Sequence, residues 1–239
     1  MKPHAIQKLH ANRLAISKKP FRARGAKLIR CPLCMLKPDF CLCQYRQTVE
    51  CNAAVILLMH DNEVLKPSNT GRLIADNIEE TYAFIWSRTK PDQMLLNLLQ
   101  NSEYQPFLVF PGEYAVEQTV ISNVEREPNK KPLFILLDGS WREARKIFHK
   151  SSYLRDLPIL SITPQEISRY KMRSASHDNQ LATAEVAAIV LSLANEQKAA
   201  DQLNLWFDCF KERYIAGKMS RQLPEECSLD KYVALTNQK

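Results

Sequence analysis

Short apolar runs alternate with helical patterns along most of the chain. Two of the runs, at 53–59 and 133–137, contain only apolar residues, which is typical of strands buried on both faces of a parallel sheet. Further strands are predicted at 82–86, 107–110 and 159–162, and helices at 72–78, 93–100, 141–148, 181–193 and about 198–214. This alternation predicts an α/β fold with a mostly parallel sheet flanked by helices.

The apolar run at 133–137 leads directly into a polar turn. Asp138, Gly139 and Ser140 break the run, and the apolar residues that follow, beginning with Trp141, recur at helical spacing. Ligands of open α/β sheets bind beyond the carboxyl ends of the strands, which makes Asp138 a candidate for binding or chemistry. In the alternative interpretation, Asp138 or Ser140 only caps the next helix.

Length and charge divide the chain into unequal parts. Its 239 residues suit one sizeable domain with an appendage. We expect a basic arm at 1–30, a cysteine knuckle at 31–50, an α/β domain at 51–200, and a helix with a polar tail at 201–239. The arm holds nine of the 33 Lys and Arg residues and no Asp or Glu, whereas the remainder has 24 basic against 26 acidic residues. Such an arm predicts nucleic-acid phosphate as a partner, with a merely solvated tail as the alternative.

Hydropathy and cysteine content indicate the compartment. The longest apolar runs are strand-length, so we expect no membrane-spanning segment, and the N-terminus lacks the apolar core of a secretory signal. The seven cysteines are odd in number, and four of them lie within 13 residues. This favours a metal site in a reducing compartment over a disulfide framework. We therefore expect a cytoplasmic protein. As its oligomeric state, we expect a monomer.

The clustered cysteines form a C-x2-C-x6-C-x-C array made of Cys31, Cys34, Cys41 and Cys43. Four thiolates at such spacings can surround one tetrahedral zinc ion, and four protein ligands leave no open position for catalysis. The zinc would therefore be structural and would fold a segment too short to have its own core. An iron–sulfur cluster can also take four cysteines, and the spacing leaves that alternative open.

Polar residues beyond the other predicted strands are candidates for the same site as Asp138. His60, Asn69 and Thr70 follow the strand at 53–59, and Pro111 and Gly112 follow the strand at 107–110. His60 is either a ligand or an ordinary histidine at the end of an apolar strand. The glycine-rich dinucleotide fingerprint, the P-loop and the hydrolase nucleophile elbow do not occur in the sequence.

Two residues in predicted helices are ambiguous. Glu185 is the only charged residue in 181–193, and burying an unpaired carboxylate is expensive. Its partner is Arg173, the amine of a ligand, or the positive end of its own helix. Trp141 lies on the apolar stripe of its helix and is either part of the core or a stacking surface.

Taken in order, the motifs resemble those of the DTW domain family, the tRNA-uridine aminocarboxypropyltransferases. The resemblance covers roughly 31–195. Besides the four-cysteine knuckle, its parts are Ser68-Asn69-Thr70-Gly71, Phe110-Pro111-Gly112-Glu113, Asp138-Gly139-Ser140-Trp141, Tyr170-x-x-Arg173 and Leu181-Ala182-Thr183-Ala184-Glu185. Ser140 stands where the family usually has Thr, which keeps the hydroxyl, and Ala182 stands where it usually has Ser, which removes one.

The resemblance implies a fold similar to that of the SPOUT-type knotted α/β methyltransferases. It also implies that S-adenosylmethionine donates its 3-amino-3-carboxypropyl group to N3 of a uridine in tRNA, in the variable loop, with release of methylthioadenosine. The sulfonium already activates three carbons, so neither a metal nor an enzyme nucleophile is required. The protein has only to deprotonate the uridine imide and to align it with one carbon.

The resemblance further implies roles for individual residues. Asp138 is the candidate general base, or it binds the amino group of the donor, as Glu185 also could. Arg173 suits the donor carboxylate or an RNA phosphate. The expected donor-binding residues are Phe110, Pro111, Gly112, Leu136, Leu137, Asp138, Ser140, Trp141, Arg173, Thr183 and Glu185. The residues expected to contact tRNA are Lys18, Lys19, Arg22, Arg24, His60, Asn69, Thr70, Arg142 and Arg145.

Two other functions remain open on the sequence. An RNA methyltransferase would use the same donor and a similar pocket. A non-catalytic RNA-binding protein would use only the knuckle and the basic arm.

Overall fold

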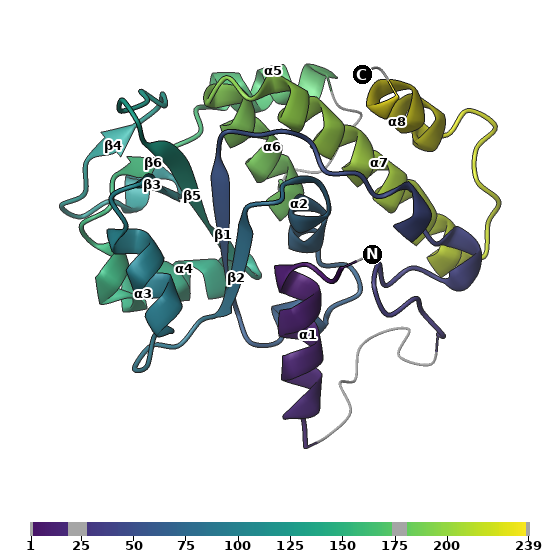
Figure 1. The fold of residues 1–239 in the computed structure, drawn as a ribbon, viewed down its shortest axis with the longest axis horizontal. Helices are drawn as coiled ribbons and strands as arrows, with labels where there is room; N and C mark the ends of the chain where they lie inside the picture. Colours follow the sequence, from purple (N-terminus) through teal and green to yellow (C-terminus); the bar gives the residue numbers. More distant parts are fainter. Residues whose placement is uncertain (1, 19–27, 174–180, 238–239) are drawn as a thin grey trace.

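The computed structural model describes residues 2–18, 28–173 and 181–237, and its centre is a six-stranded sheet (Figure 1). The strands lie in the order β2-β1-β5-β3-β6-β4, and every neighbouring pair is parallel. Their bounds are β1 (Ala54–Met59), β2 (Thr81–Ile85), β3 (Tyr104–Val109), β4 (Val120–Ile121), β5 (Lys131–Asp138) and β6 (Ile159–Leu160). The predicted α/β fold with a parallel sheet is confirmed.

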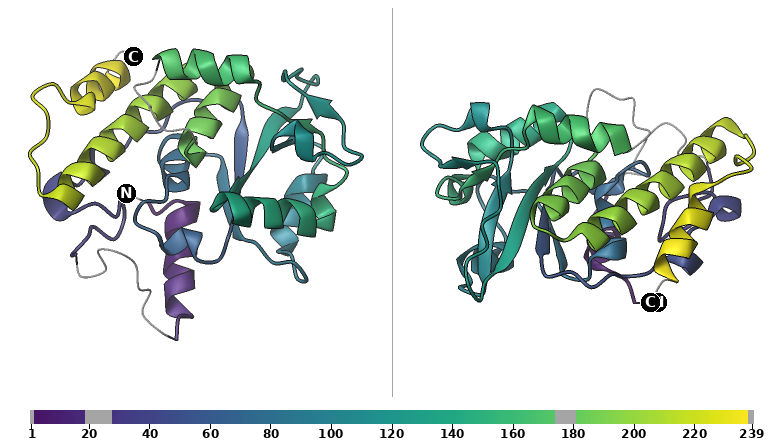
Figure 2. Two further views of the ribbon diagram at one scale, coloured as in Figure 1. Left: turned by 180° about the vertical axis from the view of Figure 1, so that it is seen from behind. Right: turned by 90° about the horizontal axis from the view of Figure 1, so that it is seen from above.

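Helices cover both faces of this sheet (Figures 1 and 2). On one face lie α2 (Gly71–Asn77), α6 (Thr183–Leu193) and α7 (Gln197–Met219). On the other face lie α3 (Gln93–Gln100) and α4 (Trp141–Lys150). The remaining helices are α1 (Ala5–Ala15), α5 (Pro164–Arg173) and α8 (Ser228–Thr236), with short 3₁₀ helices at Pro38–Phe40, Cys43–Tyr45, Glu63–Leu65, Gly112–Tyr114 and Ser152–Leu154.

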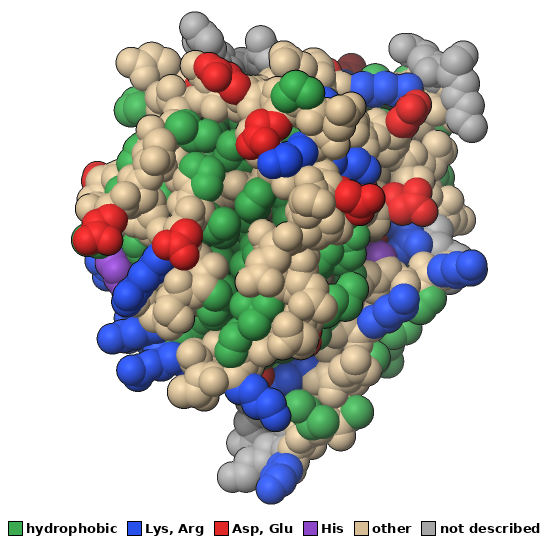
Figure 3. All heavy atoms as spheres, turned by 60° about the vertical axis from the view of Figure 1, so that its left-hand side comes forward, with side chains coloured by type: hydrophobic (Ala, Val, Ile, Leu, Met, Phe, Trp, Pro, Cys, Tyr) green, Lys and Arg blue, Asp and Glu red, His purple; other side chains and the backbone are tan. Residues whose placement is uncertain are grey.

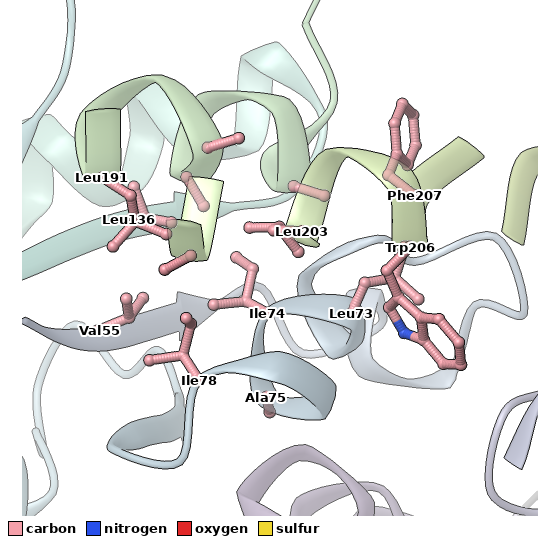
Figure 4. Packing of buried hydrophobic residues seen from close by; sticks show 14 of the residues in the cluster. Val55, Leu73, Ile74, Ala75, Ile78, Leu136, Leu191, Leu203, Trp206 and Phe207 are labelled. Atoms are coloured by element: carbon pink, nitrogen blue, oxygen red, sulfur yellow. The ribbon is translucent and has the colours of Figure 1, made fainter. Parts of the chain in front are cut away.

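The all-apolar sequence of β1 is explained by burial on two sides. Val55 and its alternate neighbours pack in the core shared with α2, α6 and α7, whereas Ile56 and its alternate neighbours pack against α3 and α4. Figure 4 shows Val55 and Leu136 of the sheet directed toward Leu191 of α6 and Leu203 of α7. The side-chain period of two in a strand sends alternate residues into two separate cores.

The strand order reverses beside β5. The chain leaves β1 for the edge strand β2, crosses to β3 and then to the opposite edge strand β4, and only then places β5 between β1 and β3. The register pairs Met59 at the end of β1 with Asp138 at the end of β5. In open parallel sheets, such a reversal opens a crevice beyond the carboxyl ends of the strands. The fold thus places Asp138 at the position where a ligand site is expected.

The first part of the basic arm is a helix packed on the domain. α1 buries Ile6, which is 2% exposed, and Arg13 binds both carboxylate oxygens of Asp61 at 2.6 and 2.7 Å. His4 adds a contact of 3.3 Å from Nε2 to Asp76. Residues 5–15 are therefore a fixed part of the structure, and the alternative of a wholly solvated tail is wrong for this segment.

Three elements differ from the sequence prediction. α8 was predicted as a polar tail, but it buries Leu229 and Tyr232, and the Tyr232 ring lies 4.8 Å from that of Trp206 in α7. α5 was not predicted as a helix, and β4 has only two residues, too few to give a periodic signal. Among the described residues, none of the helices combines the length and the apolar character needed to cross a membrane.

Candidate active site and candidate metal centre

Asp138 ends β5 and is buried, with only 2% of its surface exposed. The side-chain amide of Asn69 donates a hydrogen bond of 2.7 Å to Oδ2, and the Thr183 hydroxyl donates one of 2.6 Å to Oδ1. Asn69 lies just before α2, and Thr183 is the first residue of α6. Asp138 thus holds the beginnings of two helices against the end of the central strand.

The cap of α4 is a different residue. The backbone N–H and the hydroxyl of Ser140 both donate to Oε2 of Glu143, at 2.8 and 2.6 Å. Of the two capping candidates in the turn, Ser140 therefore serves α4, whereas Asp138 faces α2 and α6. The space around Asp138 is tight, because a Cβ atom on Gly71 would lie 2.9 Å from its Oδ2. Glycine at position 71 lets α2 begin next to the carboxylate.

The environment of Asp138 favours its protonated form. Burial raises the pKa of Asp138 from its ordinary 3.8 to about 6, and the negative charge of Glu63 acts in the same direction. The hydrogen bonds from Thr183 and Asn69 oppose this rise only in part. Glu63 belongs to the same network, because its Oε1 accepts a hydrogen bond of 3.3 Å from the amide of Asn69. Its Oε2 lies 2.5 Å from the ammonium of Lys66.

A cavity of about 510 Å³ opens beside this network, at the carboxyl ends of β3, β5 and β6. Its wall is largely apolar. The described residues around it are Val109, Phe110, Pro111, Leu136, Leu137, Gly139, Ser140, Trp141, Ala144, Leu160, Ile162, Ile167, Leu181, Thr183 and Val186. Thr183 is in the wall, while Asp138 lies behind it, so the Thr183 hydroxyl connects the cavity to the buried carboxylate.

Trp141 forms an aromatic edge of the cavity. Its ring stacks on Phe110 with centroids 5.4 Å apart and planes inclined by 10°, and Phe110 stacks in turn on Phe148 at 4.5 Å. Trp141 is 43% exposed, so the interpretation of this residue as core is wrong. The indole offers a flat surface on which a planar ligand can stack.

Most predicted donor-binding residues gather around this cavity. Seven lie in its wall, namely Phe110, Pro111, Leu136, Leu137, Ser140, Trp141 and Thr183. Gly112 is not among the wall residues. Its N–H donates to the Ser161 hydroxyl at 2.9 Å, and a Cβ atom there would lie 2.6 Å from Cγ1 of Val120, so this glycine has a packing role.

Glu185 is buried near the beginning of α6, with 3% of its surface exposed. Its Oε2 accepts a hydrogen bond of 2.7 Å from the backbone N–H of Ala182, so one oxygen serves its own helix end. Among the described residues, Oε1 of Glu185 has no hydrogen-bond partner. The side chain of Arg173, the predicted alternative partner, lies outside the described side chains.

The residues predicted to contact tRNA are divided between buried and exposed positions. Asn69 is 2% exposed and holds Asp138, which differs from the predicted RNA contact. Thr70 accepts a hydrogen bond of 3.4 Å from the backbone N–H of Ala184, and His60 lies with Nδ1 3.1 Å from Glu143. The exposed members of the set are Lys18, Arg142 and Arg145. Lys19, Arg22 and Arg24 lie outside the described residues.

Sequence reasoning left out part of the site. The network residues Glu63 and Lys66 were not proposed as site residues. The cavity also includes Ile162, Ile167 and Leu181, which come from segments around the unpredicted helix α5. Scattered apolar residues in a helix and its flanking segments carry no signal of a ligand wall, so only the fold brings them together.

The four clustered cysteines converge on one point. Their sulfur atoms all lie within 4.8 Å of one another, with Sγ–Sγ distances of 3.6 Å for Cys31–Cys43 and 3.7 Å for Cys34–Cys41. A regular tetrahedron with metal–sulfur bonds of about 2.3 Å has edges of about 3.8 Å. The arrangement therefore fits a single tetrahedral ion, and the sulfurs are too close together to enclose a cluster of several irons.

The DTW domain model matches residues 28–215, from just before the knuckle to near the end of α7. The chain belongs to the DTW domain family. The family assignment from the strand-end motifs is thus confirmed, and the matched region contains the cysteine cluster, the Asp138 network and every described residue of the cavity wall.

Two curated relatives carry the same name. The mouse (Mus musculus) tRNA-uridine aminocarboxypropyltransferase 2 is 23% identical over 181 residues, which is 72% of this chain and 58% of the mouse protein. The Macaca fascicularis tRNA-uridine aminocarboxypropyltransferase 2 is 26% identical over 123 residues, 51% of this chain and 35% of the relative. This DTW-family chain thus matches little more than half the length of the first and about a third of the second. No solved structure gives a significant match.

Proposed function

We propose that this DTW-family chain transfers the 3-amino-3-carboxypropyl group of S-adenosylmethionine to N3 of a uridine in tRNA. The observation that carries the proposal is the cavity at the carboxyl edge of the sheet, which is connected through Thr183 to the buried carboxylate of Asp138. The names of the two relatives supply the reaction class. We further propose the variable loop as the site of the uridine and the cytoplasm as the compartment.

The cavity suits a nucleoside that carries an amino-acid arm on a sulfonium sulfur. Its volume of about 510 Å³ falls within the range usual for small-molecule sites, about 300–1,000 Å³. The adenine would stack against Trp141, and backbone groups of Phe110, Leu136 and Leu137 would surround the adenosine. This arrangement leaves the amino-acid part of the donor toward α6, where Thr183 and Glu185 lie.

The proposed reaction is an in-line displacement. N3 of the uridine forms a bond to the terminal carbon of the aminocarboxypropyl chain, the carbon–sulfur bond breaks, and neutral methylthioadenosine leaves. The N3 proton passes through the Thr183 hydroxyl to Asp138. A general base works best when its pKa lies near the working pH, and the pKa of Asp138, raised to about 6 by burial, meets that requirement.

The buried carboxylate of Glu185 is our candidate for the donor's amino group. Its Oε1 is a buried acceptor without a partner among the described residues, in the same helical turn as Thr183 and Val186 of the cavity wall, and an ammonium group would complete it. Arg173 would bind the donor carboxylate. Holding both ends of the amino acid would turn its terminal carbon, and not the methyl group, toward the uridine.

The cysteine cluster has a separate role in this proposal. Cys31, Cys34, Cys41 and Cys43 would hold a structural zinc ion, which supplies a cross-link for the segment before β1. All four positions of the ion would be filled by the protein, so the transfer reaction takes place without it.

The test uses unmodified tRNA and two labelled donors. One donor carries the label in the methyl group and the other in the carboxyl carbon. The proposal predicts that only the carboxyl label enters the RNA. Entry of the methyl label would identify an RNA methyltransferase, and binding of tRNA without transfer of either label would identify a binding protein. Asp138→Asn serves as the control, because it should keep tRNA binding and lose transfer.

A further inference from the structure

The outer face of α4 is a stripe of basic side chains. Arg142, Arg145, Lys146 and Lys150 are all exposed, while Ala144 and the two apolar residues at 147–148 face the core. The spacing of i, i+3, i+4 and i+8 places these four cations along one side of the helix. At a rise of about 1.5 Å per residue, the stripe is about 12 Å long.

The charges of this stripe are not neutralised by the domain. Among the described residues, no carboxylate forms a salt bridge with any of the four cations. The acidic residue within the helix, Glu143, is held by Ser140 and His60. Arg13 of α1 is different, because its guanidinium is already bound to Asp61. The α4 stripe is therefore free to bind an anion.

Two further cations extend the stripe. Arg88 and Lys90 are exposed in the segment after β2, and Trp86 attaches this segment to α4. The indole N–H of Trp86 donates to Ser151 at 2.9 Å, and the Lys146 ammonium lies 5.5 Å from the centre of its ring. Figure 3 shows Lys and Arg side chains gathered beside a histidine along one edge of the molecule. We call the six cations of α4 and of this segment the α4 basic surface.

The α4 basic surface leads to the cavity. Trp141, the exposed edge of the cavity, is the first residue of α4, and Arg142 follows it immediately. In duplex nucleic acid, one strand carries a phosphate per about 3.4 Å, so a stripe of this length spans about three phosphates. A strand bound along α4 would bring a base to the Trp141 ring, where stacking does not depend on sequence.

We propose that the α4 basic surface binds the RNA phosphates next to the target nucleotide and so directs that nucleotide into the cavity. The inference rests on the proposed function for the choice of RNA as the polyanion. It assigns the decisive contacts to α4, whereas the sequence pattern pointed first to the arm at 1–30.

The experiment compares two variants with the same loss of charge. Arg145→Gln/Lys146→Gln changes the α4 basic surface, and Lys198→Gln/Lys231→Gln removes two exposed cations from α7 and α8, on the opposite side of the sheet. Binding of an unmodified tRNA transcript is measured by fluorescence anisotropy over a series of salt concentrations. Thermal unfolding of both variants should match that of the wild-type protein, because the four side chains are exposed.

The α4 variant should bind tRNA at least about tenfold more weakly. The negative slope of log K against log salt should become shallower by about 1.5. The α7/α8 variant should bind like the wild-type protein. Equal affinities and slopes for the two variants would overturn the proposal. So would a loss of binding to phosphatidylserine vesicles without a loss of tRNA binding, which would assign the surface to a membrane.

The proposal for the α4 basic surface and the proposed function can be refuted independently of each other. If the wild-type protein transfers carboxyl label to tRNA and the α4 variant binds tRNA normally, the surface proposal is wrong and the function stands. If neither label is transferred and the α4 variant alone binds weakly, the surface proposal stands and the function is wrong.

Discussion

The substitution Asp138→Asn should change how the stability of the protein depends on pH. Burial, followed by the charge of Glu63, raises the pKa of Asp138 from 3.8 to about 6 in the folded protein. The folded state therefore holds this proton more tightly than the unfolded state does. Stability contributed by the protonated form is present at low pH and is lost as the pH rises through the folded pKa. The side-chain amide of the variant cannot ionise, so the variant does not lose stability in this way as the pH rises.

The magnitude follows from the two pKa values. The pKa of Asp138 is 3.8 in the unfolded state and about 6 in the folded state. At about 1.4 kcal/mol per pH unit, this difference corresponds to a total change of about 3 kcal/mol in the free energy of unfolding. Most of this change falls between pH 4 and 6. Between pH 5 and pH 8, the linkage relation gives about 1.4 kcal/mol, because at pH 5 the proton is bound in the folded state and almost absent in the unfolded state.

The assay is chemical denaturation of the wild-type protein and the variant at several values between pH 5 and 8. The free energy of unfolding of the wild-type protein, relative to Asp138→Asn, should fall by about 1.4 kcal/mol over this range. Groups that do not interact with Asp138 titrate equally in both proteins and cancel. A constant difference, or a wild-type protein that gains relative stability as the pH rises, would refute the account of a carboxylate penalised by burial.

Glu143→Gln is the matched control with the opposite sign. Burial acts to raise the pKa of Glu143, but the hydrogen bonds from Ser140 and the charge of His60 outweigh it, so the pKa is lowered. The stability from this group is present above its unfolded pKa and is lost as the pH falls through its folded pKa. The two variants should therefore differ from the wild-type protein with opposite dependence on pH, and the change for Glu143→Gln should fall below pH 4.5, so its measurements extend below the range used for Asp138→Asn.

Two further predictions concern Thr183 and the cysteine cluster. Thr183→Val should lower the rate of transfer at least about a hundredfold, whereas Thr183→Ser should retain most of the rate. The reason is that only serine keeps the hydroxyl between the cavity and Asp138. Equal rates of the two variants in single-turnover assays would contradict proton transfer through this hydroxyl. Cys34→Ser should release the bound metal and lower the melting temperature, as measured by elemental analysis and calorimetry, and full zinc content in the purified variant would contradict the four-cysteine site.

The sequence predicted those parts of the structure that depend on local pattern. The strands β1 and β5 were recognisable because burial on both faces leaves no polar residue in 54–59 and 133–137. The cysteine cluster was recognisable because all four ligands lie in one short segment. In both cases, the residues that determine the structure are neighbours in the chain.

The surroundings of Asp138 depend on contacts between distant parts of the chain. Its partners Asn69 and Thr183 are 69 and 45 residues away in the sequence. The topology brings them together because α2 and α6 begin next to the end of β5. Sequence reasoning could name Asp138 as a candidate, but only the fold shows that Thr183 stands between this carboxylate and the cavity.

Trp141 and α8 illustrate a second limit. Apolar spacing in 141–148 predicted a helix, yet the same pattern could not distinguish a core indole from one that stacks on Phe110 at the edge of a cavity. In α8, the helical spacing of Leu229, Tyr232 and Val233 covers little more than one turn, and the helix is fixed by packing on α7. The SPOUT-like knot stays a prediction.

The most direct test of the account is a crystal structure of the protein with bound S-adenosylmethionine. The account predicts the adenosine in the cavity, stacked on Trp141, with the amino-acid chain directed toward Thr183 and Glu185. The terminal carbon of that chain should be open to solvent on the side of α4. Density for the donor elsewhere, or a methyl group in place of the terminal carbon on the open side, would contradict it.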